Sequence, residues 1–324
     1  MPYLYARSDK GRGASTKKKS KSMEKQSVPI FDLQNFPGKY ESPLREACEE
    51  WGCFRVVNHS IPISLMSDMK EVVKSLLDLP IEIKKRNTDT ILASGYIPQN
   101  EFNPLFEALG LYNIGSSQAV QDFCTKLDVS VHKRKIIEAY GQAVTGAAMK
   151  ISEKLASSLG LNGYSFEGWP MHCRMNKFSF TPETVGSSGV RMHTDPMFFT
   201  ILQDDENVGG LEVMNKSGEF VAVDPLPGSI LVNFGDIGSA WSNGRFYSVK
   251  HRVQCKEAST RLSIASFVLG PKEGPVEPPP EFVDDQHPRL YASFTWEDYR
   301  KLRVSTKFRN IDGLSDVRVQ PRNE

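Results

Sequence analysis

The chain has 324 residues, of which 39% are hydrophobic and 24% are charged, a composition typical of globular proteins that excludes wholesale disorder. No apolar run approaches the ~18 residues that a membrane span needs, so no membrane partner is expected. Residues 1–27 hold eight basic and two acidic side chains, which leaves 32 basic and 37 acidic side chains in the rest. Because phosphate contacts need a basic surface, the acidic body argues against a nucleic-acid partner. Residues 1–27 are expected to form a disordered basic extension.

The cysteines indicate a reducing compartment. There are five, an odd number, and no two have the C-x-x-C spacing of a zinc or redox site. They are Cys48, Cys53, Cys124, Cys173 and Cys255. Reduced thiols, together with the lack of an apolar signal segment, predict a cytoplasmic protein.

The first half of the chain has mainly helical patterns. Short strands are expected at residues 28–33 and 54–57, and residues 87–115 are expected to be rich in loops. Apolar residues recur at helical spacing in three segments, each followed by Gly or Pro: 43–51, 64–79 and 137–159.

From Met171 onward the apolar period changes from 3.6 to 2. About eight short strands separated by Gly and Pro turns are expected: 171–180, 190–193, 198–203, 209–214, 219–223, 229–234, 247–254 and 260–269. This spacing predicts an α+β fold with a jelly-roll core, on which the helical half packs. A last helix is expected near Trp296–Val304.

The regions are expected to form one integrated unit. They are a mainly helical part (28–165), a β core (166–272) and a C-terminal loop and helix (273–324).

Three residues have the pattern of a metal site. His193 and Asp195 are separated by one residue, so both side chains share one face of an extended strand. His251 follows on a later strand. Two histidines and one carboxylate form the facial triad of non-haem Fe(II) oxygenases, which leaves coordination positions for cosubstrate and oxygen. A structural zinc site would need a fourth ligand, and the spacing offers none.

Arg261 and Ser263 follow ten and twelve residues after His251, on one strand face. A guanidinium holds a carboxylate with two parallel hydrogen bonds, and the serine adds a hydroxyl donor. This pair fits the distal carboxylate of a dicarboxylic cosubstrate whose other end chelates the metal. An arginine inside an apolar strand also needs an anionic partner if it is buried.

These motifs together resemble the plant 2-oxoglutarate/Fe(II)-dependent dioxygenases, over about residues 28 to 310. Residues 51–59 (WGCFRVVNH) and 241–245 (WSNGR) resemble the same family. The resemblance implies a double-stranded β-helix that holds Fe(II) and uses 2-oxoglutarate and O2, with ascorbate as reductant. Such enzymes couple the conversion of 2-oxoglutarate to succinate and CO2 with oxidation of a small molecule.

Other stretches resemble the auxin-oxidising members of this family, such as residues 94–96 (SGY), 100–104 (NEFNP) and 249–256 (VKHRVQCK). This resemblance implies oxidation of indole-3-acetic acid to 2-oxindole-3-acetic acid. It also implies that Asn176 and the residue at position 178 help to hold 2-oxoglutarate. The family commonly has Tyr at that position, whereas this chain has Phe178, so weaker cosubstrate binding is expected.

The substrate side is expected to include Arg174, Phe267 and Phe102. Arg174 is suited to a substrate carboxylate and Phe267 to an aromatic ring, the latter as in family members. The other four histidines, His59, His132, His172 and His287, are expected to be structural.

Two alternatives stay open. The same chemistry could act on another plant metabolite of the gibberellin, flavonoid or alkaloid type. The protein could instead be a non-catalytic jelly roll that binds a small molecule and has lost 2-oxoglutarate because of Phe178. In either case a monomer is expected.

Overall fold

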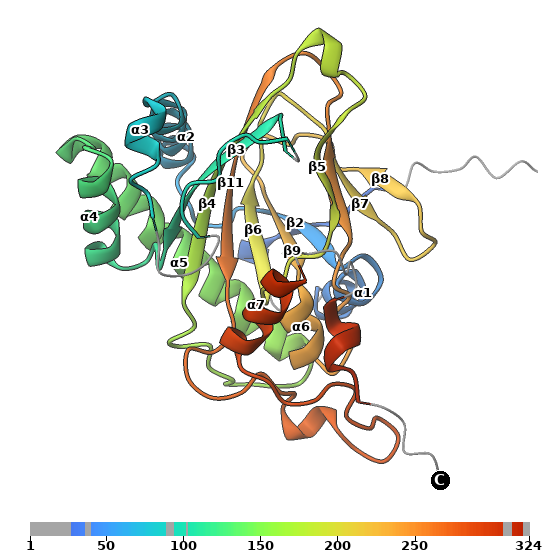
Figure 1. Ribbon diagram of the computed structural model, residues 1–324. Helices are drawn as coiled ribbons and strands as arrows, with labels where there is room; N and C mark the ends of the chain where they lie inside the picture. Colours follow the sequence, from blue (N-terminus) through green and yellow to red (C-terminus); the bar gives the residue numbers. More distant parts are fainter. Residues whose placement is uncertain (1–26, 36–39, 89–93, 102, 307–312, 320–324) are drawn as a thin grey trace, which may run out of the picture.

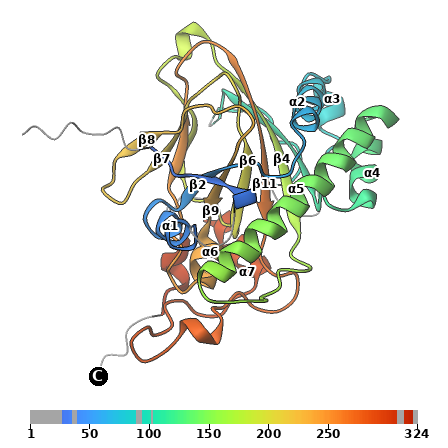
Figure 2. The same cartoon turned by 180° about the vertical axis from the view of Figure 1, so that it is seen from behind.

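The computed structural model describes residues 27–35, 40–88, 94–101, 103–306 and 313–319, and Figures 1 and 2 show it from two opposite sides. The expected basic extension therefore lies outside the described residues, apart from Ser27. Two β-sheets form the centre of the molecule, and helices pack on the outer side of the larger sheet.

The larger sheet has seven strands, antiparallel except for the first pair. In spatial order they are β1 (Ile30–Asp32), β2 (Cys53–Val57), β9 (Ile230–Phe234), β6 (Phe199–Gln203), β11 (Thr260–Val268), β4 (Met171–Ser179) and β3 (Phe106–Tyr112). The smaller sheet has four antiparallel strands. They are β5 (Ser188–His193), β10 (His251–Gln254), β7 (Leu211–Met214) and β8 (Phe220–Ala222).

Seven α-helices surround these sheets among the described residues. They are α1 (Glu41–Glu46), α2 (Ile63–Leu77), α3 (Ile81–Lys84), α4 (Ser117–Lys126), α5 (Val131–Ser158), α6 (Asp236–Trp241) and α7 (Trp296–Ser305). The longest, α5, begins where the Ser130 hydroxyl accepts a hydrogen bond from the Lys133 amide, and it ends before Gly160 at φ +86°. No helix in the described part of the chain is long and apolar enough to cross a bilayer.

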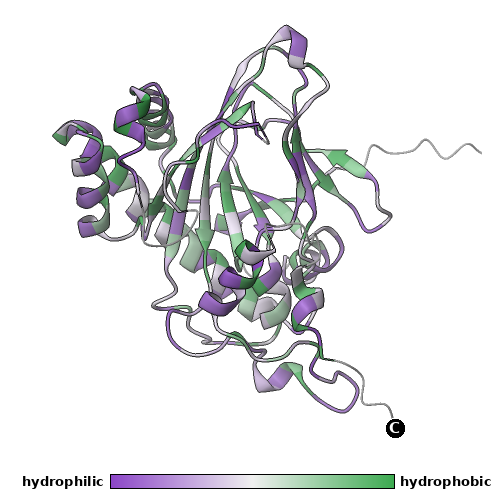
Figure 3. Cartoon of the chain, in the orientation of Figure 1, coloured by the Kyte–Doolittle hydropathy of each residue, from purple (hydrophilic) through white to green (hydrophobic). Residues whose placement is uncertain are grey.

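The two faces of the larger sheet belong to different parts of the core. Along β4, Met171, Cys173 and Met175 pack toward the helices, whereas Phe178 packs into the space between the sheets. Leu211 and Val253 of the smaller sheet belong to that same inner cluster. Figure 3 shows hydrophobic residues gathered along the central strands and hydrophilic residues on the outlying helices and loops. The strand alternation therefore decides which side chains face the barrel interior.

The expected strands and the long helix are confirmed with boundaries shifted by a few residues. The expected helix over residues 43–51 consists of α1 followed by a π-helical turn, and it ends at Gly52. A Cβ atom at Gly52 would lie 2.1 Å from the Tyr247 carbonyl oxygen, so the turn requires glycine.

One strand was not predicted: the loop-rich residues 87–115 also contain β3, an edge strand of the larger sheet. Its charged residue Glu107 is buried, with the Lys84 ammonium 2.6 Å from its carboxylate and the Tyr96 hydroxyl at 2.9 Å. This buried ion pair, together with Gly110, breaks the apolar alternation by which a strand is recognised in sequence.

Candidate metal and cosubstrate site

The three candidate metal ligands lie together at one side of the barrel. His193 ends β5 and His251 begins β10, and the two are direct partners across the antiparallel pair. Asp195 follows β5, and its Oδ1 lies 3.6 Å from His193 Nε2 and 3.8 Å from His251 Nε2. One ligand atom from each residue lies within 4.8 Å of the others, and no other such group of three is found among the described residues.

Hydrogen bonds to the backbone fix both imidazole rings. The Nδ1 atom of His193 lies 2.8 Å from the Arg191 carbonyl oxygen, and that of His251 lies 3.1 Å from the Val249 carbonyl oxygen. When Nδ1 donates to a carbonyl, the proton stays on that nitrogen and the Nε2 lone pair is free for a metal. Burial and the neighbouring His251 lower the pKa of His193 to about 4, so this ring is neutral at physiological pH.

A hydrogen bond from the larger sheet orients Asp195. The Thr200 hydroxyl, on β6, donates a 2.5 Å hydrogen bond to its Oδ2, so Oδ1 faces the histidines. Burial alone would raise the pKa of Asp195, but the two histidines and the Thr200 hydrogen bond outweigh this and bring it below its usual value. Asp195 is therefore an ionised carboxylate with one oxygen available.

A second layer supports the segment that carries Asp195. The Asp236 amide donates to the Asp195 carbonyl at 2.8 Å. The carboxylate of Asp236 accepts from the Tyr299 hydroxyl at 2.7 Å, and Arg303 of the same helix α7 donates to the Thr194 carbonyl at 3.4 Å. Gly235 allows this approach, since a Cβ there would lie 2.5 Å from the Asp195 carbonyl oxygen. The C-terminal helix thus braces the metal-ligand segment.

The donor set fits iron. Two neutral imidazole nitrogens and one carboxylate oxygen approach from one side, which is the arrangement that non-haem Fe(II) sites use. The three side chains have little freedom to rearrange, because each also hydrogen-bonds to a group of the protein, either a backbone carbonyl or the Thr200 hydroxyl.

Arg261 has the anionic partner that its burial requires. Its side chain is 1% exposed, and Nη2 donates to Oδ1 of Asp204, which follows β6. Burial raises the pKa of Asp204, and the nearby Arg261 opposes this shift. Reasoning from the sequence missed Asp204. Asp204 could have been found from its position just after β6, the strand that pairs with β11, which carries Arg261.

The other expected cosubstrate residues lie beside Arg261 on the same inner wall. Ser263 and Asn176 are cross-strand partners on β11 and β4, and the Asn176 amide donates to the Ser263 hydroxyl at 3.3 Å. Phe178 is the cross-strand partner of Arg261, whose Cζ lies 5.1 Å from the ring centre. The four residues form one patch.

Further along the same wall lie the expected substrate residues. The Arg174 guanidinium carbon lies 5.9 Å from the centre of the Phe267 ring, and His172 stacks on that ring with an interplanar angle of 12°. Partial burial lowers the pKa of Arg174, while the negative charge of Asp195 opposes this shift. The wall therefore runs from His172 through Arg174 toward the metal ligands. Phe102, the third expected substrate residue, lies outside the described residues.

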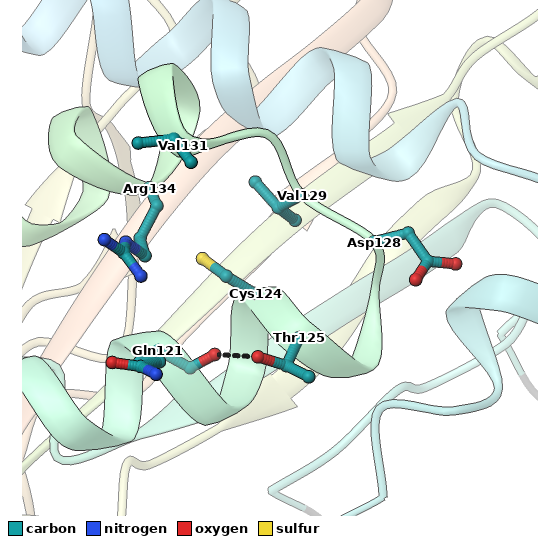
Figure 4. Close-up of a pocket in the computed structure, with 7 residues that line it drawn as sticks. All are labelled: Gln121, Cys124, Thr125, Asp128, Val129, Val131 and Arg134. Atoms are coloured by element: carbon teal, nitrogen blue, oxygen red, sulfur yellow. Dashed lines mark hydrogen bonds between the residues drawn. The ribbon is translucent and has the colours of Figure 1, made fainter.

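A cleft elsewhere in the molecule does not belong to this site. It measures about 200 Å³ and lies between α4 and the start of α5 (Figure 4). Its lining includes Cys124, Asp128 and Arg134, and none of the expected site residues. Burial raises the pKa of Cys124 to about 11, so that thiol is not a reactive thiolate.

Comparison with known proteins agrees with this geometry. Residues 169–270 match the model of the 2OG-Fe(II) oxygenase superfamily, and residues 28–132 match that of the "non-haem dioxygenase in morphine synthesis N-terminal" region. The chain is 48% identical over 293 residues to a rice (Oryza sativa subsp. indica) protein named 2-oxoglutarate-dependent dioxygenase DAO, covering 89% of this chain and 98% of the relative.

Two solved structures are also similar. The crystal structure of the rice dioxygenase for auxin oxidation has a TM-score of 0.84 at 47% identity, covering 90% of this chain and all of that one. The Arabidopsis thaliana dioxygenase for auxin oxidation 1, in a binary complex with 2-oxoglutarate, has a TM-score of 0.78 at 52% identity, covering 81% of this chain and all of that one. The resemblance and the jelly-roll core expected from sequence are both confirmed.

Proposed function

Because the chain belongs to the 2OG-Fe(II) oxygenase superfamily, we propose that it oxidises indole-3-acetic acid to 2-oxindole-3-acetic acid. It is a 2-oxoglutarate-dependent dioxygenase that uses Fe(II), and O2 and ascorbate are typical for the family. To this reaction class the proposal adds the identity of the substrate. It rests on the similarity to the rice and Arabidopsis dioxygenases for auxin oxidation and on one observation, the placement of Arg174 against Phe267 on the wall that leads to Asp195.

Each side chain then has a specific task. His193, Asp195 and His251 hold iron, which with O2 supplies the oxidising chemistry while 2-oxoglutarate is consumed. Arg261 and Ser263 bind the distal carboxylate of 2-oxoglutarate, with Asn176 orienting the serine hydroxyl and Phe178 packing beside the guanidinium.

Arg174 and Phe267 bind the substrate. The guanidinium pairs with its carboxylate, and the phenyl ring stacks against its aromatic system. Fixing both ends of a small acid holds its ring in one orientation toward the metal, which is the main contribution that positioning makes to such a reaction.

Mass spectrometry of the complete reaction tests the proposal. Indole-3-acetic acid incubated with the protein, Fe(II), 2-oxoglutarate and ascorbate should gain one oxygen atom, a mass increase of about 16, and an equal amount of succinate should form. A panel of gibberellin and flavonoid substrates provides the comparison. Succinate release driven by a panel member and not by the indole acid would refute the assignment.

We also propose that the chain acts as a cytoplasmic monomer in which residues 28–165, 166–272 and 273–324 work together. All five cysteines are unpaired and buried, which suits a reducing compartment. The hydrogen bonds from Tyr299 to Asp236 and from Arg303 to the Thr194 carbonyl support one catalytic unit. Light scattering at micromolar concentration tests the oligomeric state, and a dimer mass would refute it.

A further inference from the structure

His172 is a buried polar side chain on the inner wall of the barrel. It lies on β4, two residues before Arg174, and 5% of its surface is exposed. Neither Nδ1 nor Nε2 has a hydrogen-bond partner within the described part of the chain. Buried polar atoms in folded proteins are nearly always paired, so such an atom points to a group that the described residues do not supply, such as a bound ligand.

The fold holds this ring in place by contacts that leave its nitrogen atoms unengaged. One face stacks on Phe267, with ring centres 5.9 Å apart. On the other neighbouring strand, β3, Gly110 makes room for the ring, since a Cβ there would lie 3.0 Å from His172 Cε1. A ring fixed by stacking presents its edge, and therefore its nitrogens, in a defined direction.

The ring is neutral at physiological pH. Burial lowers the pKa of His172 to about 3, and the positive charge of Arg174 acts in the same direction. A neutral imidazole has one N–H donor and one nitrogen acceptor. A ligand held by Arg174 and Phe267 would therefore meet an acceptor at the edge of its ring.

We propose that His172 determines substrate specificity by accepting a hydrogen bond from a ring N–H of the bound aromatic acid. This inference rests on the proposed function and adds to it the chemistry by which the ring is recognised. Arg174 recognises the carboxylate, Phe267 the aromatic face and His172 the N–H group. The selected class is aromatic acetic acids with a nitrogen-bearing ring, in preference to analogues of the same shape without the N–H.

Calorimetry on the protein loaded with Mn(II) and 2-oxoglutarate tests the proposal without turnover. The probes are indole-3-acetic acid and 1-benzothiophene-3-acetic acid, in which sulfur replaces the N–H. One neutral hydrogen bond corresponds to a preference of up to about ten-fold, so the wild-type protein should bind the indole acid about ten-fold more tightly. His172→Phe keeps the stacked ring without nitrogen and should lose this preference, with indole binding weakened and benzothiophene binding unchanged.

Two further variants serve as controls. His172→Gln restores an acceptor and should recover part of the preference, and His132→Phe, on the exposed start of α5, should behave as wild type. The affinity of each variant for 2-oxoglutarate should stay within two-fold of wild type, which shows that the barrel is folded. An equal preference in wild type and His172→Phe, or none in wild type, would overturn the role of His172. Failure of the wild-type protein to bind the indole acid at all would instead refute the proposed substrate.

Discussion

The metal-ligand group and the wall formed by β4 and β11 differ in how their polar atoms are satisfied. His193, His251 and Asp195 each have a second partner inside the protein, on a backbone carbonyl or on Thr200. On the wall, ring nitrogens of His172, an oxygen of Asn176 and a nitrogen of Arg261 lack partners among the described residues. The side chains of the first region are held in their orientation before the metal binds. The second region has unpaired polar atoms that can bind organic ligands. Substitutions in each region test this division.

Removing a metal ligand should have the largest effect on activity, because it leaves only two of the three ligands that hold the metal. His193→Ala is expected to reduce succinate formation below detection in assays with Fe(II) and 2-oxoglutarate. His132→Ala, which alters a histidine far from the site, should keep the wild-type rate. Full turnover by His193→Ala would show that His193 is not a ligand.

Arg261→Lys tests the cosubstrate end of the wall. Lysine keeps the charge but loses the planar pair of donors, so one charge-assisted hydrogen bond is lost at about 1.5–3 kcal/mol. The Kd for 2-oxoglutarate in the Mn(II)-loaded protein should rise roughly 10- to 150-fold by calorimetry. An unchanged Kd would mean that the cosubstrate carboxylate binds elsewhere.

Thr200→Val asks whether the preset orientation of Asp195 matters. The substitution removes the hydroxyl at nearly constant shape, and loss of such a supporting bond typically weakens metal binding about 10- to 100-fold. Titration with Mn(II), followed by electron paramagnetic resonance, measures the change. Thr200→Ser retains the hydroxyl and should bind as wild type, and equal binding by the valine variant would contradict the orienting role.

Phe178→Tyr should improve cosubstrate binding. A hydroxyl at this position would add one donor near Arg261, and the KM for 2-oxoglutarate should fall by about ten-fold or less. The neighbouring Phe180, whose ring centre is 5.7 Å away, provides a matched control in Phe180→Tyr. If both variants leave KM unchanged, the expectation that Phe178 weakens cosubstrate binding is refuted.

The smallest effect concerns stability and pH. The pKa of His172 is about 3 in the folded state against 6.5 for an unperturbed histidine. The unfolded chain therefore takes up the proton first, so this residue lowers stability as the pH falls through 6.5 toward 3. His172→Phe should remove that loss, which amounts to less than about 1 kcal/mol at pH 6. Urea unfolding of metal-free protein at pH 7.5 and pH 6 measures it, and parallel losses in both proteins would contradict the assignment.

Much of the fold and of the site was predictable because regular spacing encodes it. The period-2 runs after Met171 specify the strands, and the spacing of His193, Asp195 and His251 brings them to one point once those strands pair. What the sequence does not contain is the pairing of residues that are distant along the chain. Asp204 and Glu107 look like surface carboxylates until their buried partners, Arg261 and Lys84, are placed beside them.

The surroundings of His172 could not be predicted for a related reason. A single histidine in a strand is usually structural, and nothing local distinguishes this one. Only the register of β4 against β11 places it on Phe267, and only the surrounding side chains show that its nitrogens lack partners.

The contacts of α7 have a consequence for any attempt to shorten the protein. Asp236 lies inside the segment 169–270 that matches the oxygenase family model, yet one hydroxyl and one guanidinium group that face its carboxylate come from Tyr299 and Arg303 of α7. A fragment cut after residue 294 would leave a carboxylate that is 2% exposed facing a hole where those two side chains had been. Water would enter directly behind the turn that carries Asp195. The shortened chain would keep all three metal ligands and would lose the contacts that α7 makes behind the segment carrying Asp195.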